Sequence, residues 1–166
     1  LKLPFFILGG GTNVLALDKG YNGLIIKIAN LQFLIRNCSV HAGAGLSLAK
    51  LLSLVAAKSL TGLEWAAGIP GTVGGAVYGN AQAFGNKMSD CIKSVEVFDV
   101  KTSKVRTFKK RKCKFSEKES IFKKKKNLII LSVILELKRG NKNNIEKKIK
   151  EHIYFRKKNQ PLQFPS

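Results

Sequence analysis

The chain has 166 residues, with 30 Lys and Arg against 10 Asp and Glu and a formal net charge of +20. This length allows a single domain or two small lobes with a buried core. No stretch approaches the roughly twenty apolar residues of a membrane-spanning helix, and no leader peptide with a cleavage site is visible. We therefore expect a cytoplasmic protein without a membrane segment. Leu1 leads directly into an apolar run with no initiator Met, which indicates a fragment.

The excess of positive charge would suit a nucleic-acid-binding protein, but its distribution argues against that function. Lysines concentrate in runs at 109–112, 123–126, 138–150 and 157–158. Few aromatic residues lie between them to stack on bases, and such runs are typical of solvated loops and helix faces. The positive charge would still create a field that steers anionic nucleotides toward a site, and this alternative role stays open.

The three cysteines predict neither disulfide bonds nor a metal site. Cys38, Cys91 and Cys113 are widely spaced, without a CxxC pair or a histidine at metal-ligand spacing. We expect reduced, structural thiols and no bound metal.

In chain order, the first feature is an apolar run at residues 3–8 that leads into GGGTN at residues 9–13. A strand that ends in three glycines resembles a phosphate-binding loop, although the spacing fits neither the Walker nor the dinucleotide motif. Residues 14–17 predict a further strand. An ordinary turn with Asn13 in the left-handed region explains the glycines equally well.

Short strands and one helix follow this loop. Residues 23–28, 31–35 and 39–42 have the composition of strands, and His41 lies in the last of them as a packed or surface residue. Apolar residues at 48, 51, 52 and 55 then follow a helical period. A helix is predicted from an N-cap at Ser47 to about Lys58, covering the strands.

Residues 62–80 form a second glycine-rich stretch that carries almost no charge. Its glycines allow peptide N–H groups to point at a ligand, and an anion suits such a nest. Pro70 fixes φ where a helix could begin, so Gly71 and Thr72 would offer donors at a helix N-terminus. Close packing of small residues is the alternative. Glu64 is expected to cap backbone donors beside the stretch, and Trp65 to fill the core.

The C-terminal half alternates strands and lysine-rich segments. Residues 94–99 and 104–108 predict a β-hairpin, and the apolar run at 127–137 predicts a central strand buried on both faces. A helix is expected from Asn143, with Glu146 completing a capping box, to about Lys158.

Three segments together resemble a known family. Residues 9–15 (GGGTNVL), 40–45 (VHAGAG) and 62–76 (GLEWAAGIPGTVGGA), followed by Asn80, Gly85 and Asp90, resemble the UDP-N-acetylenolpyruvoylglucosamine reductases in order and spacing. The resemblance implies an FAD-dependent oxidoreductase, UDP-N-acetylmuramate dehydrogenase, of peptidoglycan synthesis. It also implies an α+β fold: a two-lobed FAD-binding module of the vanillyl-alcohol-oxidase (PCMH) type, with the third, substrate domain absent.

The same resemblance implies domains, ligands and site residues. Residues 1–60 would be the first FAD-binding subdomain, incomplete at its N-terminus, 61–155 the second, and 156–166 a linker toward a missing C-terminal substrate domain. FAD would be the cofactor, NADPH the co-substrate and a UDP-sugar the substrate. The implied FAD contacts are Gly9, Gly10, Gly11, Thr12, Asn13, Ile69, Pro70, Gly71, Thr72, Gly74, Gly75, Ala76 and Asn80.

One motif departs from the family at its central positions. Residues 113–122 resemble the family's Cys-x-Phe-x-Tyr-Arg-x-Ser-x-Phe, but Glu117 replaces Tyr and Lys118 replaces the family's catalytic Arg. Lysine keeps the charge and loses the bidentate fork that suits a carboxylate. Lys118 is the candidate catalytic residue by position, and an exposed loop residue without a catalytic role is the alternative.

The expected function is therefore the FAD-binding part of an NADPH-dependent reductase that converts UDP-N-acetylglucosamine-enolpyruvate to UDP-N-acetylmuramate. The chain is expected to be catalytically incomplete, because the sequence stops before the position of the family's proton-donating serine. The alternatives are a non-catalytic flavin-binding remnant and a basic nucleic-acid-binding module.

Overall fold

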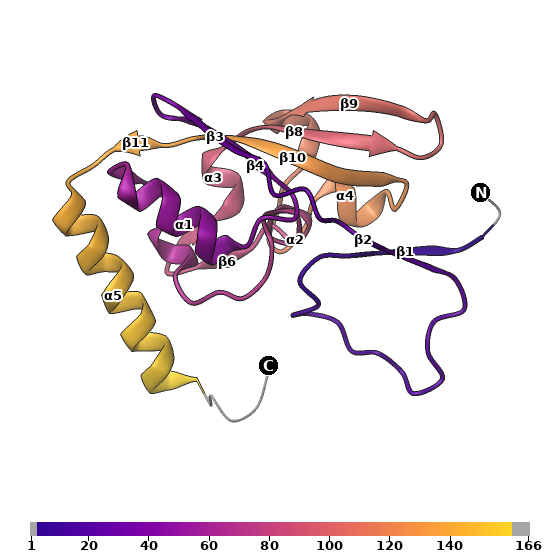
Figure 1. Ribbon diagram of the computed structural model, residues 1–166, viewed down its shortest axis with the longest axis horizontal. Helices are drawn as coiled ribbons and strands as arrows, with labels where there is room; N and C mark the ends of the chain where they lie inside the picture. Colours follow the sequence, from indigo (N-terminus) through magenta and orange to yellow (C-terminus); the bar gives the residue numbers. More distant parts are fainter. Residues whose placement is uncertain (1–2, 161–166) are drawn as a thin grey trace.

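The protein is described by a computed structural model over residues 3–160. Its N-terminal part is a small parallel pair of strands, β1 (Phe5–Leu8) and β2 (Leu24–Lys27), with Phe5 opposite Leu24. In Figure 1 this indigo segment and its long connecting loop lie beside the main body of the molecule.

The main body is built on a five-stranded antiparallel sheet in the order β3-β4-β10-β8-β9. Its strands are β3 (Phe33–Arg36), β4 (Ser39–Gly43), β8 (Ile92–Asp99), β9 (Lys104–Lys109) and β10 (Leu128–Glu136). β10 is the middle strand, as predicted, and its first three residues are all buried. β8 and β9 form the predicted hairpin, in which Asp99 pairs with Lys104 next to the turn.

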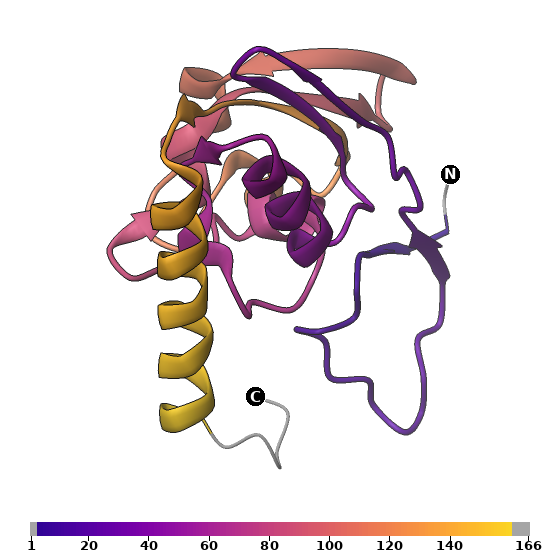
Figure 2. The same ribbon diagram turned by 60° about the vertical axis from the view of Figure 1, so that its left-hand side comes forward.

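Helices cover one face of this sheet, as the ribbon views show (Figures 1 and 2). The α-helices are α1 (Leu48–Ala57), α2 (Val73–Tyr78), α3 (Met88–Cys91), α4 (Ile121–Lys124) and α5 (Lys142–Asn159). Ser47 is the N-cap of α1, as predicted, and accepts a hydrogen bond from Lys50 N. The apolar stripe of α1 is buried, and it packs with Trp65 and the inner residues of the sheet into one hydrophobic core.

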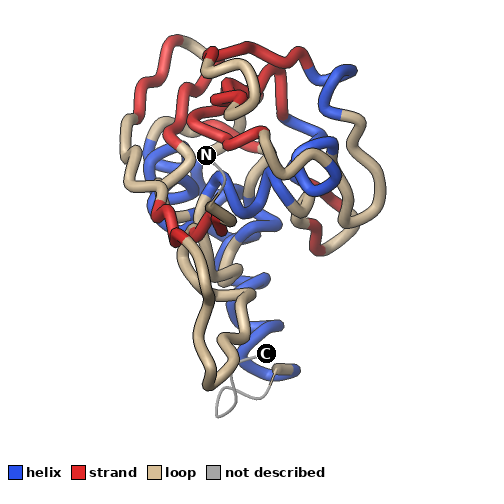
Figure 3. Tube along the Cα trace, turned by 90° about the vertical axis from the view of Figure 1, so that its right-hand side faces the viewer, coloured by secondary structure: helices blue, strands red, loops and turns tan. Residues whose placement is uncertain are grey.

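Short elements complete the chain. They are the 3₁₀ helices η1 (Glu64–Ala66) and η2 (Lys110–Cys113) and the two-residue strands β5 (Leu60–Thr61), β6 (Gln82–Ala83), β7 (Asn86–Lys87) and β11 (Lys138–Arg139). β5 pairs with β11, and β6 pairs with β7 across a tight turn. Through β11 the chain passes from the sheet into α5, which extends downward from the main body toward the C-terminus in Figure 3.

Three local predictions were wrong. Residues 14–17 form no strand, and Leu15 is 92% exposed, because β1 pairs with β2 and leaves this segment no partner. The helix after Pro70 begins only at Val73, since Thr72 is its N-cap. The N-cap of α5 is Asn141, whose side chain accepts from Asn144 N, and not Asn143.

The expected subdomains divide the chain differently from its sheets. β3 and β4 precede residue 61, yet β4 pairs with β10, so that Val40 lies opposite Leu135. The sheet therefore contains strands from both expected subdomains. The boundary between residues 60 and 61 stays a prediction that rests on the family resemblance. Of the expected linker at 156–166, residues 156–159 continue α5, and 161–166 lie outside the described residues.

Candidate functional site

The two glycine-rich loops, the first at residues 9–13 and the second at residues 68–72, are far apart in the sequence but touch each other. A Cβ atom at Gly9 would lie 2.7 Å from Thr72 Oγ1, and one at Gly10 would lie 3.4 Å from Gly71 Cα. Thr12 Oγ1 lies 3.5 Å from Pro70 O, within reach to donate a hydrogen bond. The absence of side chains at positions 9 and 10 is what lets the loops come this close.

The second loop is held by the segment that begins α1. Leu48 N donates to Gly71 O over 3.0 Å, and Val73 N donates to Leu46 O over 2.8 Å. Thr72 Oγ1 accepts from Gly75 N at 3.3 Å and so caps α2. The loop is therefore fixed on the main body, and its position does not depend on the first loop.

Both loops present backbone donors that the protein itself does not use. The N–H groups of Gly10, Gly11, Gly71 and Thr72 find no hydrogen-bond acceptor within residues 3–160. Gly11 and Gly71 have φ values of +73° and +122°, which few other residues adopt. Adjacent N–H groups in such turns form a concave nest for anions. By contrast, the first N–H groups of α2 already have acceptors in the protein, since Val73 N donates to Leu46 O and Gly74 N donates to Ala44 O.

Some predicted contact residues have packing roles instead of exposed donors. A Cβ atom at Gly74 would lie 2.9 Å from Ala44 Cβ, so Gly74 lets α2 pack on the turn that follows β4. Ala76 is 4% exposed and belongs to the core. Asn80, with φ of +44°, is 1% exposed, and its amide donates to Ser116 O and accepts from Ser89 N. These three residues support the site from behind.

The remaining predicted residues lie on or near the accessible loops. Thr12, Asn13, Pro70 and Gly75 are exposed, and Ile69 is half-buried against the core.

Lys118 lies at a different place from the glycine loops. It is exposed, with φ of +48°, in the turn where Ser116 pairs with Glu119. Asn80 ties this turn to the C-terminal end of α2, whereas the glycine loops meet at the N-terminal end. The six-residue helix α2, which rises about 1.5 Å per residue, thus lies between the turn that carries Lys118 and the nest of N–H groups.

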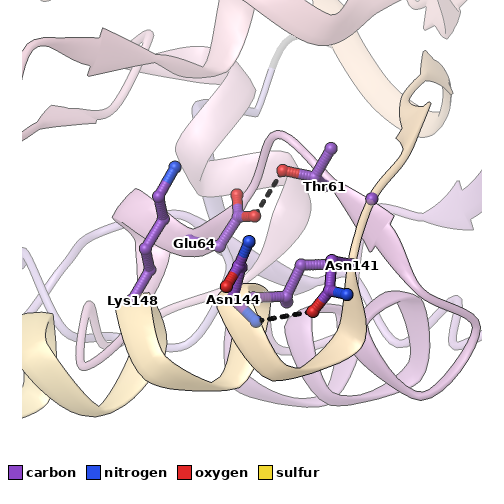
Figure 4. Close-up of a pocket in the computed structure, with 7 residues that line it drawn as sticks. Thr61, Glu64, Asn141, Asn144 and Lys148 are labelled. Atoms are coloured by element: carbon purple, nitrogen blue, oxygen red, sulfur yellow. Dashed lines mark hydrogen bonds between the residues drawn. The ribbon is translucent and has the colours of Figure 1, made fainter.

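Glu64 fastens the approach to the second loop. Its carboxylate accepts hydrogen bonds from the Thr61 hydroxyl and from Gly62 N, as predicted. Burial alone would raise the pKa of Glu64, but the hydrogen bonds from Thr61 and from backbone N–H groups, with the charge of Lys148, outweigh it and lower the pKa. Figure 4 shows Glu64, Thr61 and Lys148 around a shallow pocket of about 170 Å³.

Sequence reasoning missed the contribution of α5 to this region. His152 Nδ1 lies 2.9 Å from Glu64 O, and Arg156 Nε donates to Ala67 O over 2.9 Å. Phe84, at the β6–β7 turn, stacks on the His152 ring with centroids 3.9 Å apart. Arg156 lies at the start of the expected linker, and only the helical spacing of residues 152 and 156 could have indicated a shared face.

Two further features of the described residues concern metal-ion sites and membrane-spanning helices. Within residues 3–160, no three His, Cys, Asp or Glu side chains gather into a group that could hold a metal ion. No helix in the same range is long and apolar enough to cross a membrane.

Comparison with known proteins identifies the family. A family model described as "FAD binding domain" matches residues 1–109. UDP-N-acetylenolpyruvoylglucosamine reductase from Caldanaerobacter subterraneus is 40% identical over 166 residues, which are 99% of this chain and 54% of the relative. The Lachnoclostridium phytofermentans protein of the same name is 39% identical, with the same shares covered. The chain thus spans about half the length of the curated relatives it matches.

Solved structures agree with this result. The UDP-N-acetylenolpyruvylglucosamine reductase of Thermus caldophilus matches with a TM-score of 0.83 and 32% identity, covering 96% of this chain and 58% of that protein. Cholesterol oxidase from Brevibacterium sterolicum matches with a TM-score of 0.60 at 14% identity, over 81% of this chain and 30% of the oxidase, which shows a shared fold. The α+β fold of the vanillyl-alcohol-oxidase type is thereby confirmed. The chain belongs to the FAD-binding domain family, and it is homologous to the FAD-binding portion of the UDP-N-acetylenolpyruvoylglucosamine reductases.

Proposed function

We propose that the two glycine loops together bind the pyrophosphate of FAD. The observation that carries this proposal is the pair of unused donor sets, one in residues 9–13 and one at Gly71 and Thr72, brought into contact. A pyrophosphate carries negative charge and oxygen acceptors, which suit adjacent backbone N–H groups.

The residues present fit such a group. Thr12, whose hydroxyl lies at the contact of the two loops, would turn its single O–H from Pro70 O to the ligand, and Asn13 and Gly75 would border the nucleotide. Ile69 and Pro70 would provide apolar contact beside it. Gly74, Ala76 and Asn80 would hold α2 in place, because their side chains or missing side chains serve internal packing.

FAD titration tests the proposal directly. Trp65 is the chain's single tryptophan and is 2% exposed in η1, shortly before the second loop. Its emission should be quenched by bound flavin, and the fluorescence of the flavin should change in parallel. A saturable change in both signals at micromolar FAD supports the proposal, and the absence of any change counts against it.

We further propose that this chain serves the reductase reaction after which its longer relatives are named. When bound, FAD would supply hydride transfer from NADPH to one carbon of the enolpyruvyl double bond of UDP-N-acetylglucosamine-enolpyruvate, and a proton delivered to the other carbon by a general acid would complete UDP-N-acetylmuramate in the cytoplasm. This chain's own candidate for the substrate carboxylate is Lys118, which is exposed and offers a point charge without a bidentate fork.

Anaerobic NADPH oxidation, with and without the enolpyruvyl substrate, tests this reaction. The assay compares this chain with a chimera that adds the C-terminal part of the Caldanaerobacter relative. Substrate-dependent oxidation by the chimera supports the reductase. If the chimera binds flavin but does not turn over, the second candidate, a non-catalytic flavin-binding module, is favoured. The exposed positions of Glu117 and Lys118 support this second candidate. Nucleic-acid binding, the remaining alternative, would show affinity that falls steeply with salt.

A further inference from the structure

A second cavity, apart from the glycine loops, lies between α3 and η2. Its volume is about 360 Å³, and four cationic side chains line it: Lys87, Lys110, Arg111 and Lys114. No residue that lines it belongs to either glycine loop. The size is within the range of small-molecule sites, which is about 300–1,000 Å³.

The charge in this cavity is strongly unbalanced. Its one carboxylate, Asp90, accepts a hydrogen bond from Lys87 N over 3.0 Å and thereby starts α3. None of the four cations forms an ion pair with any carboxylate in the described part of the chain. The cavity therefore keeps a net positive charge that a compact anion with several oxygens would neutralise.

The walls of the cavity are fixed by the fold. Cys113 is fully buried, and its Sγ lies 3.5 Å from Lys109 O, which anchors η2 between the cationic residues. Lys114 ends η2 as its C-cap, in the left-handed conformation with φ of +48°. On the other side, Ser89 N donates to Asn80 Oδ1 over 3.0 Å.

We propose that this cavity binds a small phosphorylated anion at a site separate from the FAD-binding loops. Arg111 supplies a planar fork for phosphate oxygens, and the lysines supply point charges. Phe115, which is half-buried in the same wall, gives the ligand an apolar contact. The backbone of the walls is held in place without a ligand, so binding needs to order only the exposed Lys and Arg side chains.

An NMR titration of the full chain tests this site. The protein, saturated with FAD, is titrated with inorganic pyrophosphate while the backbone amide signals are followed. Saturable shifts at Ser89 and residues 110–115 are expected. Replacing Arg111→Gln and Lys114→Asn together should weaken this binding about tenfold, since charge-assisted hydrogen bonds are lost. Asn is chosen at 114 because it tolerates positive φ.

A matched control distinguishes binding at this cavity from general attraction of the anion to the positive charge of the protein. Lys101→Gln with Lys104→Gln removes the same charge at the other end of the β8–β9 hairpin and should leave the affinity unchanged. Equal weakening by both pairs, or shifts without saturation, would overturn the proposal. So would shifts confined to residues 9–13 and 71–75.

FAD affinity provides a readout that distinguishes this proposal from the previous one. The Arg111→Gln, Lys114→Asn variant should bind FAD as the parent chain does. If neither the parent chain nor the double variant binds FAD, but pyrophosphate still shifts the parent chain's signals of residues 110–115, the FAD proposal fails and the anion site stands. If FAD binds and pyrophosphate leaves those signals unmoved, the anion site fails alone.

Discussion

Gly9 and Thr72 approach so closely that a Cβ atom on the glycine would lie 2.7 Å from Thr72 Oγ1. That separation is shorter than a van der Waals contact, so a side chain at position 9 must push the loops apart. We expect Gly9→Ala to weaken FAD binding about tenfold or more, because the two donor sets would no longer face one ligand. Quenching of Trp65 emission by FAD gives the affinity.

The partner substitution provides the control for that prediction. Gly9→Ala combined with Thr72→Gly removes the clash, and glycine is a tolerable N-cap that costs only a few tenths of a kcal/mol. FAD affinity should then recover in large part. No recovery would show that Gly9→Ala acts in some way other than through contact with Thr72.

Glu64→Gln should destabilise the fold at neutral pH. The buried carboxylate accepts from Thr61 and Gly62, and hydrogen bonds to charged groups contribute about 1.5–3 kcal/mol each. Since glutamine retains part of this bonding, we expect a loss of about 1–2 kcal/mol in the free energy of unfolding, measured by urea denaturation. Glu151→Gln, at an exposed position on α5, should leave it nearly unchanged.

The Glu64 carboxylate should also make the stability of the fold depend on pH, in a direction that its lowered pKa determines. Its folded-state pKa is lowered from the ordinary value of 4.5, so its contribution is present above that pH and is lost as the pH falls through the folded pKa. The stability gap between the parent chain and Glu64→Gln should therefore narrow in acid, below about pH 4.5. A gap that stays constant down to pH 3 would contradict the assigned role.

Asn80→Ala should be among the costly polar substitutions. It removes the hydrogen bonds to Ser116 O and from Ser89 N, and leaving the buried Ser89 N unsatisfied costs about 1–3 kcal/mol. Alanine is also less suited than asparagine to φ of +44°. We expect a loss of at least about 2 kcal/mol in urea unfolding. Asn86→Ala, which removes one exposed bond to Phe84 O, should cost far less.

The cysteines should differ sharply in their reaction with iodoacetamide. Burial raises the pKa of Cys91 to about 12 and that of Cys113 to about 11, so few thiolates form at pH 8. Cys38 is half-buried and should be alkylated in the folded protein, whereas the other two should react only in denaturant. Mass spectrometry after a timed exposure reads this out, and rapid native labelling of Cys91 would contradict its burial.

The strands and helices that sequence reasoning located were those with a clear period or an unbroken apolar run. β10 and α1 are of this kind, since their residues fit one geometry over many positions. Residues 14–17 are equally apolar but have no partner strand, and local composition cannot report whether a partner exists. Helix starts were misplaced by two or three residues, at Thr72 and Asn141, because several residues that can cap a helix lie side by side there.

Prediction of the candidate site from the sequence was limited in the same way. Its glycines could be found from the sequence, and the family resemblance assigned them to a flavin. Neither could show that Gly9 touches Thr72, or that Asn80 faces inward to Ser116. The contacts of His152 and Arg156 with the segment before Gly68 depend on where α5 packs, and no local pattern encodes that position.

The place of β10 between β4 and β8 has a consequence for how the chain is made. On the ribosome, β3 and β4 leave the exit tunnel long before the strand that completes their hydrogen bonding. Pairing between segments so distant in the sequence forms slowly. Until β10 arrives, the apolar face of β4 and the stripe of α1 have no sheet to cover them. Nascent chains that end before Leu128 should therefore be the ones that depend on chaperones.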